Sequence, residues 1–231
     1  MHNLTSIQTQ GLTLTVRDGD FGRWDRGIVA EVAREYCWGD VDWAQVRYAM
    51  DVGGHIGSWT LRAAQHAPAA RIIAVEPHPE NYVLLAINTH DQLERLFAVH
   101  GAVYYGEAAL NPAAENSGGH VMTAGGSIRV ETYTIEQLMS QYGFPQLDVL
   151  KLDCEGSEHN IFAHMEDGTL DCTRWIVGEH HCTAEAFLQQ HSARLDGRFA
   201  IRMIPHPNAD VHDLGMFFME NRAWQPTASN S

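Results

Sequence analysis

The chain has 231 residues, of which 45% are hydrophobic and 19% are charged, so it is long enough to form one large domain with a sizeable core. Acidic residues outnumber basic ones by 29 to 15, which gives a formal net charge of −14. A surface of this charge repels phosphate backbones, so we expect neither DNA nor RNA as the main partner. No apolar run reaches the roughly 18 residues that suggest a membrane span.

The cysteines and the first residues of the chain bear on its location. Cysteines that are few and lack a C-x-x-C pairing are typical of reduced thiols in a cytoplasmic protein. The four are Cys37, Cys154, Cys172 and Cys182. The sequence begins without a basic segment followed by an apolar one, so we expect no signal peptide and a cytoplasmic protein.

The N-terminal part predicts a strand and then a helix. Residues 12–17 alternate in polarity and predict an early strand, and residues 26–38 predict a helix because Ile28, Val32 and Tyr36 recur at a spacing of four. Residues 21–27 mix aromatic, charged and glycine residues. We interpret them as a loop that anchors the helix, with a lid over a bound ligand as the alternative.

Strand-like and helix-like segments then alternate, which predicts an α/β domain with a mostly parallel sheet and helices on both faces. Seven core strands are expected at residues 46–52, 71–77, 96–105, 147–153, 174–181, 199–206 and 214–221, the last two forming an antiparallel hairpin. Helices are expected at residues 58–67, 79–90, 134–143 and 157–165. Residues 111–127 contain two Gly-Gly pairs and predict a loop or a loose hairpin.

This pattern also predicts the domain organisation. Residues 46–222 would form the main domain, residues 1–45 an extension of strand and helix packed on it, and residues 223–231 a flexible tail. In an open sheet of this kind, ligands bind at the carboxyl ends of the strands.

A glycine-rich segment, "DVGGHIGS", lies where the first core strand gives way to a helix. A dinucleotide fingerprint would require glycine at Val52, so the pattern is Asp51, Gly53 and Gly57 instead. Glu76 follows at the end of the next strand, where a carboxylate can accept two hydrogen bonds from a ribose diol. The segment therefore predicts a nucleoside-type site, with a purely structural turn as the alternative.

Asp51 to Gly57 together with Glu76 resemble the first two motifs of class I S-adenosylmethionine-dependent methyltransferases. Three separate motifs sharpen the match, and the chain resembles the FkbM family over residues 46–182. The matching residues are Asp51, Gly53, Ile56 and Gly57, then Glu76, Pro77, Pro79 and Asn81, then Asp148, Lys151, Asp153, Glu155, Gly156 and Glu158. The chain departs from the family at His55, where asparagine is common, and at Gly54, where alanine is common.

The resemblance implies a Rossmann-like class I methyltransferase fold that binds S-adenosylmethionine. The glycines would let the backbone approach the methionine portion of the cofactor, and Glu76 would hold its ribose. The expected cofactor-binding residues are Asp51, Gly53, Gly54, His55, Ile56, Gly57, Glu76, Pro77, His78, Asn81, Ala102 and Asp153.

Polar residues at the ends of two later strands are candidates for catalysis. Lys151 and Asp153 share one face of a strand, and Glu155 lies in the turn beyond. They can supply a base or a metal ligand, joined by His180 from the next strand, or they can form an ion pair and stabilise a helix N-terminus. Catalytic candidates are thus Lys151, Asp153, Glu155 and His180. A divalent metal ion, held by Asp153, Glu179 and His181, is the alternative means of activation.

The function expected from these residues is O-methylation of a small natural-product, sugar or lipid-linked acceptor. An amine acceptor remains an alternative. A nicotinamide-dependent oxidoreductase is disfavoured by Val52, and a non-catalytic binding protein by the presence of Asp153 and Glu155.

Overall fold

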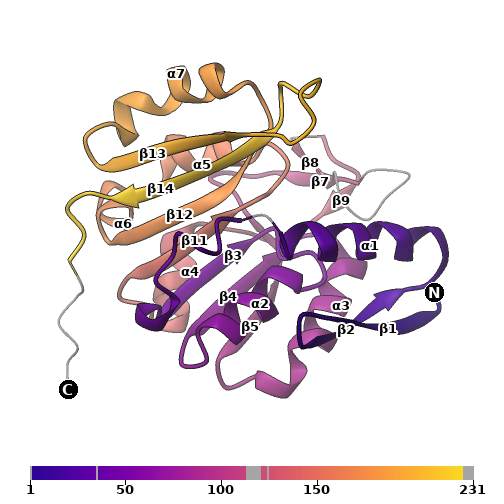
Figure 1. Cartoon of the computed structure of the whole chain (residues 1–231). Coiled ribbons are helices and arrows are strands. Elements are labelled where there is room, and N and C mark those ends of the chain that lie inside the picture. The colour runs from indigo at the N-terminus through magenta and orange to yellow at the C-terminus, as the bar shows by residue number, and fades with distance from the viewer. Residues whose placement is uncertain (1, 35, 113–120, 124, 226–231) are drawn as a thin grey trace.

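In a computed structural model, the chain forms an α/β domain with a central seven-stranded sheet (Figure 1). The structure describes residues 2–34, 36–112, 121–123 and 125–225. The sheet strands are β3 (Tyr48–Val52), β4 (Arg71–Glu76), β5 (Leu96–His100), β11 (Leu147–Leu152), β12 (Thr173–His180), β13 (Phe199–Pro205) and β14 (Gly215–Asn221). Their order is β13-β14-β12-β11-β3-β4-β5.

The pairing of the strands confirms a mostly parallel sheet. Neighbours from β12 to β5 pair in parallel, whereas β14 runs antiparallel to both β12 and β13. The chain order reverses between β3, which is followed by β4 on one side, and β11, which lies on the other. A ligand crevice is expected at that switch point, beyond the carboxyl ends of β3 and β11.

Two hydrophobic cores cover the two faces of the sheet because successive strand residues point to opposite faces. Ala49, Val149 and Val177 face a core shared with α1 (Gly19–Val32), α2 (Ser58–His66) and α3 (Pro79–Thr89). Met50 and Leu150, one position along, face a second core. That core is shared with α4 (Ile135–Tyr142), α5 (Glu158–His164), α6 (Asp167–Asp171) and α7 (Ala184–Leu195).

The N-terminal region differs from the prediction. A hairpin of β1 (Leu4–Thr9) and β2 (Leu12–Arg17) precedes α1, and α1 begins at Gly19, not at residue 26. Asp18 starts the helix early because its side chain accepts a hydrogen bond from the Gly19 backbone N–H. Residues 21–27 therefore lie inside the helix and do not form a loop. The helix ends at Val32, so Tyr36 belongs to the following loop, where its φ is 65°.

Between residues 96 and 133 the structure has more and shorter strands than the sequence predicted. The third strand ends at His100, and Gly101 separates it from β6 (Ala102–Val103), which pairs with β10 (Thr132–Tyr133). The expected loop at 111–127 overlaps a small sheet of β7 (Ala109–Asn111), β8 (Val121–Thr123) and β9 (Ile128–Arg129). Residues 113–120 and 124 lie outside the described residues, as does the end of the expected tail, residues 226–231.

The remaining helices include both predicted and additional ones. The capping box at Thr134 and Gln137 starts α4 as predicted, and Gly143 ends it with a φ of 66°. Helices α6 and α7 are additional to the predicted set, and short 3-10 helices occur at Trp43–Gln45 and His90–Gln92. Among the described residues, none of the helices has both the length and the apolar character that crossing a bilayer requires.

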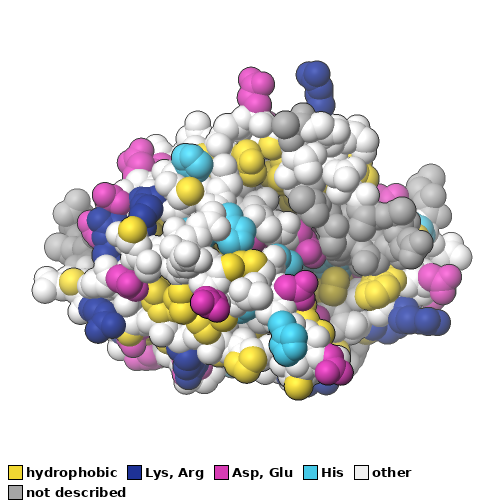
Figure 2. All heavy atoms as spheres, turned by 90° about the horizontal axis from the view of Figure 1, so that it is seen from above, with side chains coloured by type: hydrophobic (Ala, Val, Ile, Leu, Met, Phe, Trp, Pro, Cys, Tyr) yellow, Lys and Arg dark blue, Asp and Glu magenta, His cyan; other side chains and the backbone are white. Residues whose placement is uncertain are grey.

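The surface reflects the excess of acidic residues. On the face seen in Figure 2, acidic side chains occur both at the rim and nearer the middle, histidine side chains lie nearer the middle, and lysine and arginine side chains lie near the rim. All four cysteines are free thiols.

Candidate active site

The glycine-rich segment forms the turn between β3 and α2. Gly53, His55 and Gly57 all have positive φ, at 80°, 48° and 89°. Histidine is among the few non-glycine residues enriched in this region, as asparagine is, so His55 keeps the backbone shape that the family's usual asparagine would have. The segment folds back on itself because three left-handed residues occur within five positions.

Gly53 also lacks a side chain for a reason within the protein itself. A Cβ atom at this position would lie 1.7 Å from the backbone oxygen of Asp153. The missing side chain thus lets the β3–α2 turn touch the β11–α5 turn, so that the two loops meet at the switch point of the sheet. Gly54 and Gly57 instead pack against Leu85 of α3.

The buried side chain of Lys151 contacts both of these turns. Its Nζ donates to the backbone oxygen of Gly53 at 2.6 Å and lies 3.0 Å from Asp51 Oδ1 and 3.6 Å from Asp153 Oδ2. Burial alone lowers the pKa of Lys151, but Asp51 and Asp153 outweigh it, and the net pKa lies above its usual range. The contacts and the raised pKa describe Lys151 as a buried cation held against the loop. Asp51, fully buried, also accepts a hydrogen bond from Thr60 Oγ1.

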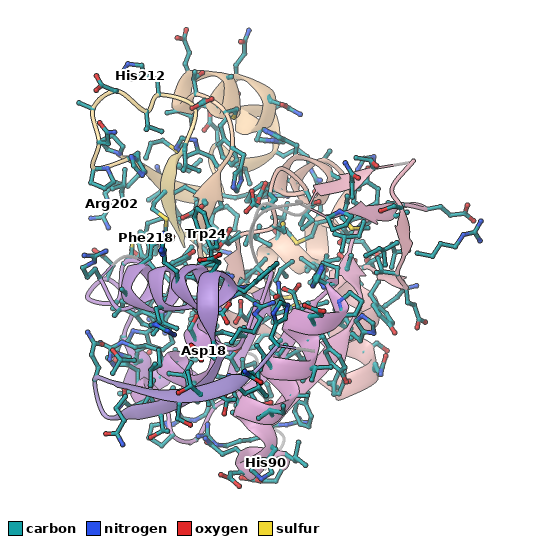
Figure 3. The ribbon with its side chains drawn as sticks, turned by 90° about the vertical axis from the view of Figure 1, so that its right-hand side faces the viewer. Asp18, Trp24, His90, Arg202, His212 and Phe218 are labelled. Atoms are coloured by element: carbon teal, nitrogen blue, oxygen red, sulfur yellow. The ribbon has the colours of Figure 1, made fainter. Side chains whose placement is uncertain are left out.

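A cavity of about 580 Å³ opens beyond the carboxyl ends of β3, β4, β11 and β12. On one side it is lined by residues at and just beyond the ends of β3, β4 and β5: Gly53, His55, Glu76, Pro77, Asn81 and Ala102. On the other side it is lined by Asp153, Glu155 and Glu179, and the helix α1 covers it with Trp24, Ile28 and Glu31. Trp24 points from α1 toward the C-terminal strands that carry Arg202 and Phe218 (Figure 3).

Glu76 is held at both carboxylate oxygens. Its Oε2 accepts from the backbone N–H of His55 at 2.8 Å, and its Oε1 accepts from the backbone N–H of His78 at 2.8 Å and from Asn81 Nδ2 at 3.4 Å. Burial raises the pKa of Glu76 to about 7, against these hydrogen bonds, which lower it. The carboxylate is thus fixed in direction and changes its charge close to neutral pH.

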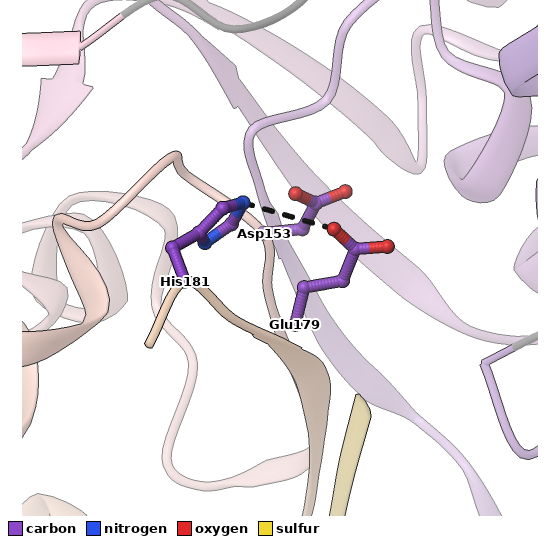
Figure 4. Close-up of side chains that lie close together, drawn as sticks. All are labelled: Asp153, Glu179 and His181. Atoms are coloured by element: carbon purple, nitrogen blue, oxygen red, sulfur yellow. Dashed lines mark ion pairs between the residues drawn. The ribbon is translucent and has the colours of Figure 1, made fainter. Parts of the chain in front are cut away.

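An acidic cluster with one histidine lies across the cavity (Figure 4). One ligand atom each from Asp153, Glu179 and His181 lie within 4.8 Å of one another. His181 Nε2 lies 3.3 Å from Glu155 Oε2 and 3.7 Å from Glu179 Oε2. Burial lowers the pKa of His181, but Glu158, Glu155 and Asp153 prevail and raise it to about 9, so its ring is cationic at neutral pH. Burial, with the charges of Asp153 and Glu31, raises the pKa of Glu179.

The site contains residues that sequence reasoning missed. Tyr36 donates its hydroxyl hydrogen to Asp153 Oδ2 at 2.5 Å, although its spacing had placed it in the helix core. A second cavity of about 500 Å³ adjoins the first and shares Arg34, Glu179, His206, Pro207 and Leu214 with it. Tyr36 lines this second cavity.

The comparisons with known proteins decide the family. A family model described as Methyltransferase FkbM domain matches residues 51–211. The chain belongs to the FkbM methyltransferase family.

Solved structures agree with this methyltransferase fold. M. jannaschii TYW2, solved in complex with AdoMet, is similar with a TM-score of 0.52 at 12% identity, over 96% of this chain and 88% of that one. A Streptococcus pneumoniae protein, Sp1610, described as a putative tRNA (m1A22) methyltransferase, has a TM-score of 0.51 at 10% identity, over 89% and 73%. The search of curated proteins found no match. At such identities the structures support the fold alone, while the family match shows an S-adenosylmethionine-dependent methyltransferase and replaces the oxidoreductase and non-catalytic hypotheses.

The methyltransferase brings together only some of the expected site residues. Its cavity is lined by seven of those expected to bind cofactor: Gly53, His55, Glu76, Pro77, Asn81, Ala102 and Asp153. The other five do not line the cavity; they are Asp51, Gly54, Ile56, Gly57 and His78.

The catalytic candidates divide in the same way. Asp153 and Glu155 line the cavity, whereas Lys151 is buried beneath it. His180 lies on the opposite face of β12 from Glu179, where its ring contacts Phe187 and its Nδ1 is 2.7 Å from the Cys182 oxygen. The geometry therefore gives His180 no access to the cavity.

Proposed function

We propose that this methyltransferase transfers a methyl group to an oxygen atom of a small natural-product, sugar or lipid-linked acceptor. The observation that carries the proposal is one cavity with a fixed carboxylate, Glu76, on one side and the cluster of Asp153, Glu155 and Glu179 on the other. The preference for oxygen rests on the FkbM resemblance, and an amine acceptor is the alternative.

The Glu76 side fits the cofactor. A volume of about 580 Å³ lies within the range of small-molecule sites. Glu76 would accept hydrogen bonds from the ribose hydroxyls, beside Gly53, His55 and Ala102. S-adenosylmethionine, when bound, supplies a methyl group already activated on a sulfonium. The protein's own tasks are therefore to align two reactants, worth roughly 7–11 kcal/mol, and to take up a proton.

Asp153 is the residue we assign to that proton. It lines the cavity, and Tyr36 and Lys151 hold its carboxylate in place. The second cavity joins the first at Glu179, so an acceptor seated there would have to extend into the first cavity to bring its hydroxyl group to Asp153. Behind it, Glu155 forms an ion pair with His181.

A divalent metal ion is the alternative means of activating the acceptor. Asp153, Glu179 and His181 would hold it, since one carboxylate or imidazole ligand atom from each lies within the same 4.8 Å. Such a donor set suits Mn, Fe or Zn, and the ion would polarise the acceptor oxygen as a Lewis acid. Calorimetric titration of the protein with MnCl₂, in wild type and in His181→Ala, distinguishes this route from proton transfer to Asp153 alone.

The nature of the acceptor is the second part of the test. The net charge of −14 disfavours a phosphate backbone, but the similar structures include an rRNA methyltransferase from T. thermophilus. Its TM-score is 0.50 at 10% identity, over 95% of this chain and 50% of that one. An acceptor panel must therefore contain RNA beside small molecules. We also propose a cytoplasmic location, in keeping with the free thiols.

The experiment combines calorimetry with a transfer assay. Glu76→Ala should weaken S-adenosylmethionine binding about 100-fold, because two hydrogen bonds to a charged group are lost. Asp153→Asn should retain cofactor binding but slow the formation of S-adenosylhomocysteine about 10²- to 10⁴-fold. The acceptors tested are monosaccharides, phenols, hydroxylated fatty acids, primary amines and tRNA. Asp171→Asn, on the surface, is the matched control. Full turnover in Asp153→Asn would refute the assignment of Asp153, and turnover on tRNA alone would refute the acceptor class.

A further inference from the structure

Arg17 and Asp25 form a buried ion pair in the N-terminal extension. Arg17 is the last residue of β2, and Asp25 lies in the middle of α1. Both are buried, at 2% and 0% exposure. Arg17 Nη2 donates to Asp25 Oδ1 at 2.7 Å, and its Nε and its backbone N–H donate to Oδ2 at 3.0 and 2.9 Å. The pair thus has the forked geometry that only arginine provides.

One arm of this pair reaches the cofactor side of the cavity through Asn81. The same Arg17 Nη2 also donates to Asn81 Oδ1 at 2.7 Å. Because the guanidinium takes the amide oxygen, the amide nitrogen of Asn81 is turned toward Glu76, 3.4 Å from Oε1. The reverse orientation would place two oxygens against each other and leave the guanidinium facing an NH₂ group.

The other arm reaches the same carboxylate through the glycine-rich turn. Asp25 Oδ1 lies 3.7 Å from His55 Nε2, and the backbone N–H of His55 donates to Glu76 Oε2 at 2.8 Å. His55 has a left-handed backbone, which a non-glycine residue keeps only where its surroundings hold it. Both oxygens of Glu76 are therefore bonded to residues that the Arg17–Asp25 pair touches.

We propose that Arg17 and Asp25 are positioning residues for the cofactor: through Asn81 and His55 they fix the direction in which Glu76 presents its carboxylate to the cavity. The extension then forms part of the cofactor site without lining it at these two positions. This proposal rests on the proposed role of Glu76.

The test compares Arg17→Lys with Val16→Ala in S-adenosylmethionine calorimetry and thermal unfolding. A lysine keeps the charge but lacks the planar fork that bonds both Asp25 oxygens while it also reaches Asn81, so we expect the dissociation constant to rise about tenfold. Val16, fully buried on the same strand, touches the shared core and not this network. Val16→Ala should lower the unfolding temperature while changing the dissociation constant less than twofold. In a transfer assay, Arg17→Lys should raise KM for the cofactor more than it lowers kcat.

A double-mutant cycle tests whether Arg17 affects cofactor binding through Glu76. In a Glu76→Gln background, Arg17→Lys should cause no further loss of affinity, because the group that it positions is already changed. An equal loss in both backgrounds would overturn the proposal, as would Arg17→Lys behaving like Val16→Ala. If Glu76→Gln itself left the affinity unchanged, the proposed cofactor site would fail, which is a different outcome from failure of the positioning role.

Discussion

Non-glycine residues with left-handed backbone gather at the two cavities. Within the described chain they are Gln10, Tyr36, Cys37, His55 and Glu155. Gln10 belongs to the β1–β2 hairpin turn, but the other four line one cavity or the other. Strained backbone of this kind persists where surrounding contacts enforce it, and it is concentrated at functional sites. The site is therefore held in shape by its loops as much as by its strands.

Gly53 offers a direct test of the contact between two of these loops. Gly53→Ala places a Cβ against the Asp153 oxygen in addition to straining a left-handed residue, so we expect a loss of about 3–5 kcal/mol in the free energy of unfolding. Gly156→Ala is the matched variant: its φ is 94°, but no atom lies within 4 Å of the added carbon. It should cost only about 1–2 kcal/mol. Urea denaturation measures both, and equal losses would show that the contact with Asp153 is unimportant.

Glu76 predicts a pH dependence of cofactor affinity. Its pKa is raised to about 7, so below neutral pH the carboxyl group is protonated and loses part of its capacity to accept hydrogen bonds. S-adenosylmethionine should bind more weakly at pH 6 than at pH 8. The raised pKa also means that ionised Glu76 reduces folding stability as the pH rises from 4.5 through 7. Calorimetry across this range checks the affinity, with Glu76→Gln expected to give a flatter profile.

At the scale of elements, α5 and α7 meet through a pair of histidines. His159 Nδ1 and His191 Nε2 are 2.8 Å apart, and the His191 ring packs against Phe162 and Phe187. A hydrogen bond between two imidazoles requires that one of these two nitrogens lack its proton. The packing of α7 on α5 therefore depends on histidines that are not both charged.

This pair should make the protein labile in acid. Burial, with His159 and Arg194, lowers the pKa of His191 to about 4. The folded pKa lies below the unfolded value of 6.5, so its contribution to stability is present above pH 6.5 and is lost as the pH falls toward 4. We expect a loss of about 1–2 kcal/mol at pH 5 relative to pH 7.5. Thermal unfolding at both pH values measures it, and His191→Gln should reduce the difference; an unchanged difference would place the effect elsewhere.

Elements were predictable where the signal is local. The capping box before α4 and the short apolar runs of the core strands confirm this, because capping and runs of apolar side chains are properties of neighbouring residues. Helix α7 was missed although Thr183 caps it and Phe187, His191 and Leu195 recur at a spacing of four. The contact of Tyr36 with Asp153 spans 117 positions, and no local pattern contains it.

For the whole molecule, the family motifs predicted the fold, the sheet and one side of the cavity, because the turns after parallel strands converge at one edge. For the covering of that edge, the composition of residues 21–27 could not decide between an anchor for the helix and a lid. Leu14, Val16, Val29 and Val32 of the N-terminal extension share a core with Ala63 and Trp59 of α2, so the extension has no separate interior. The position of Arg17 behind Asn81, 64 residues away, follows from that packing alone.

The carboxyl groups that line the cavity would affect both the binding of the cofactor and the release of its product. Asp153 and Glu155 face the space in which the proposed reaction removes a positive charge from the bound nucleoside. Anionic walls attract the charged reactant more than the neutral molecule left behind, and the difference shrinks as ionic strength grows. Asp153 and Glu155 would thereby favour the release of S-adenosylhomocysteine after each turnover.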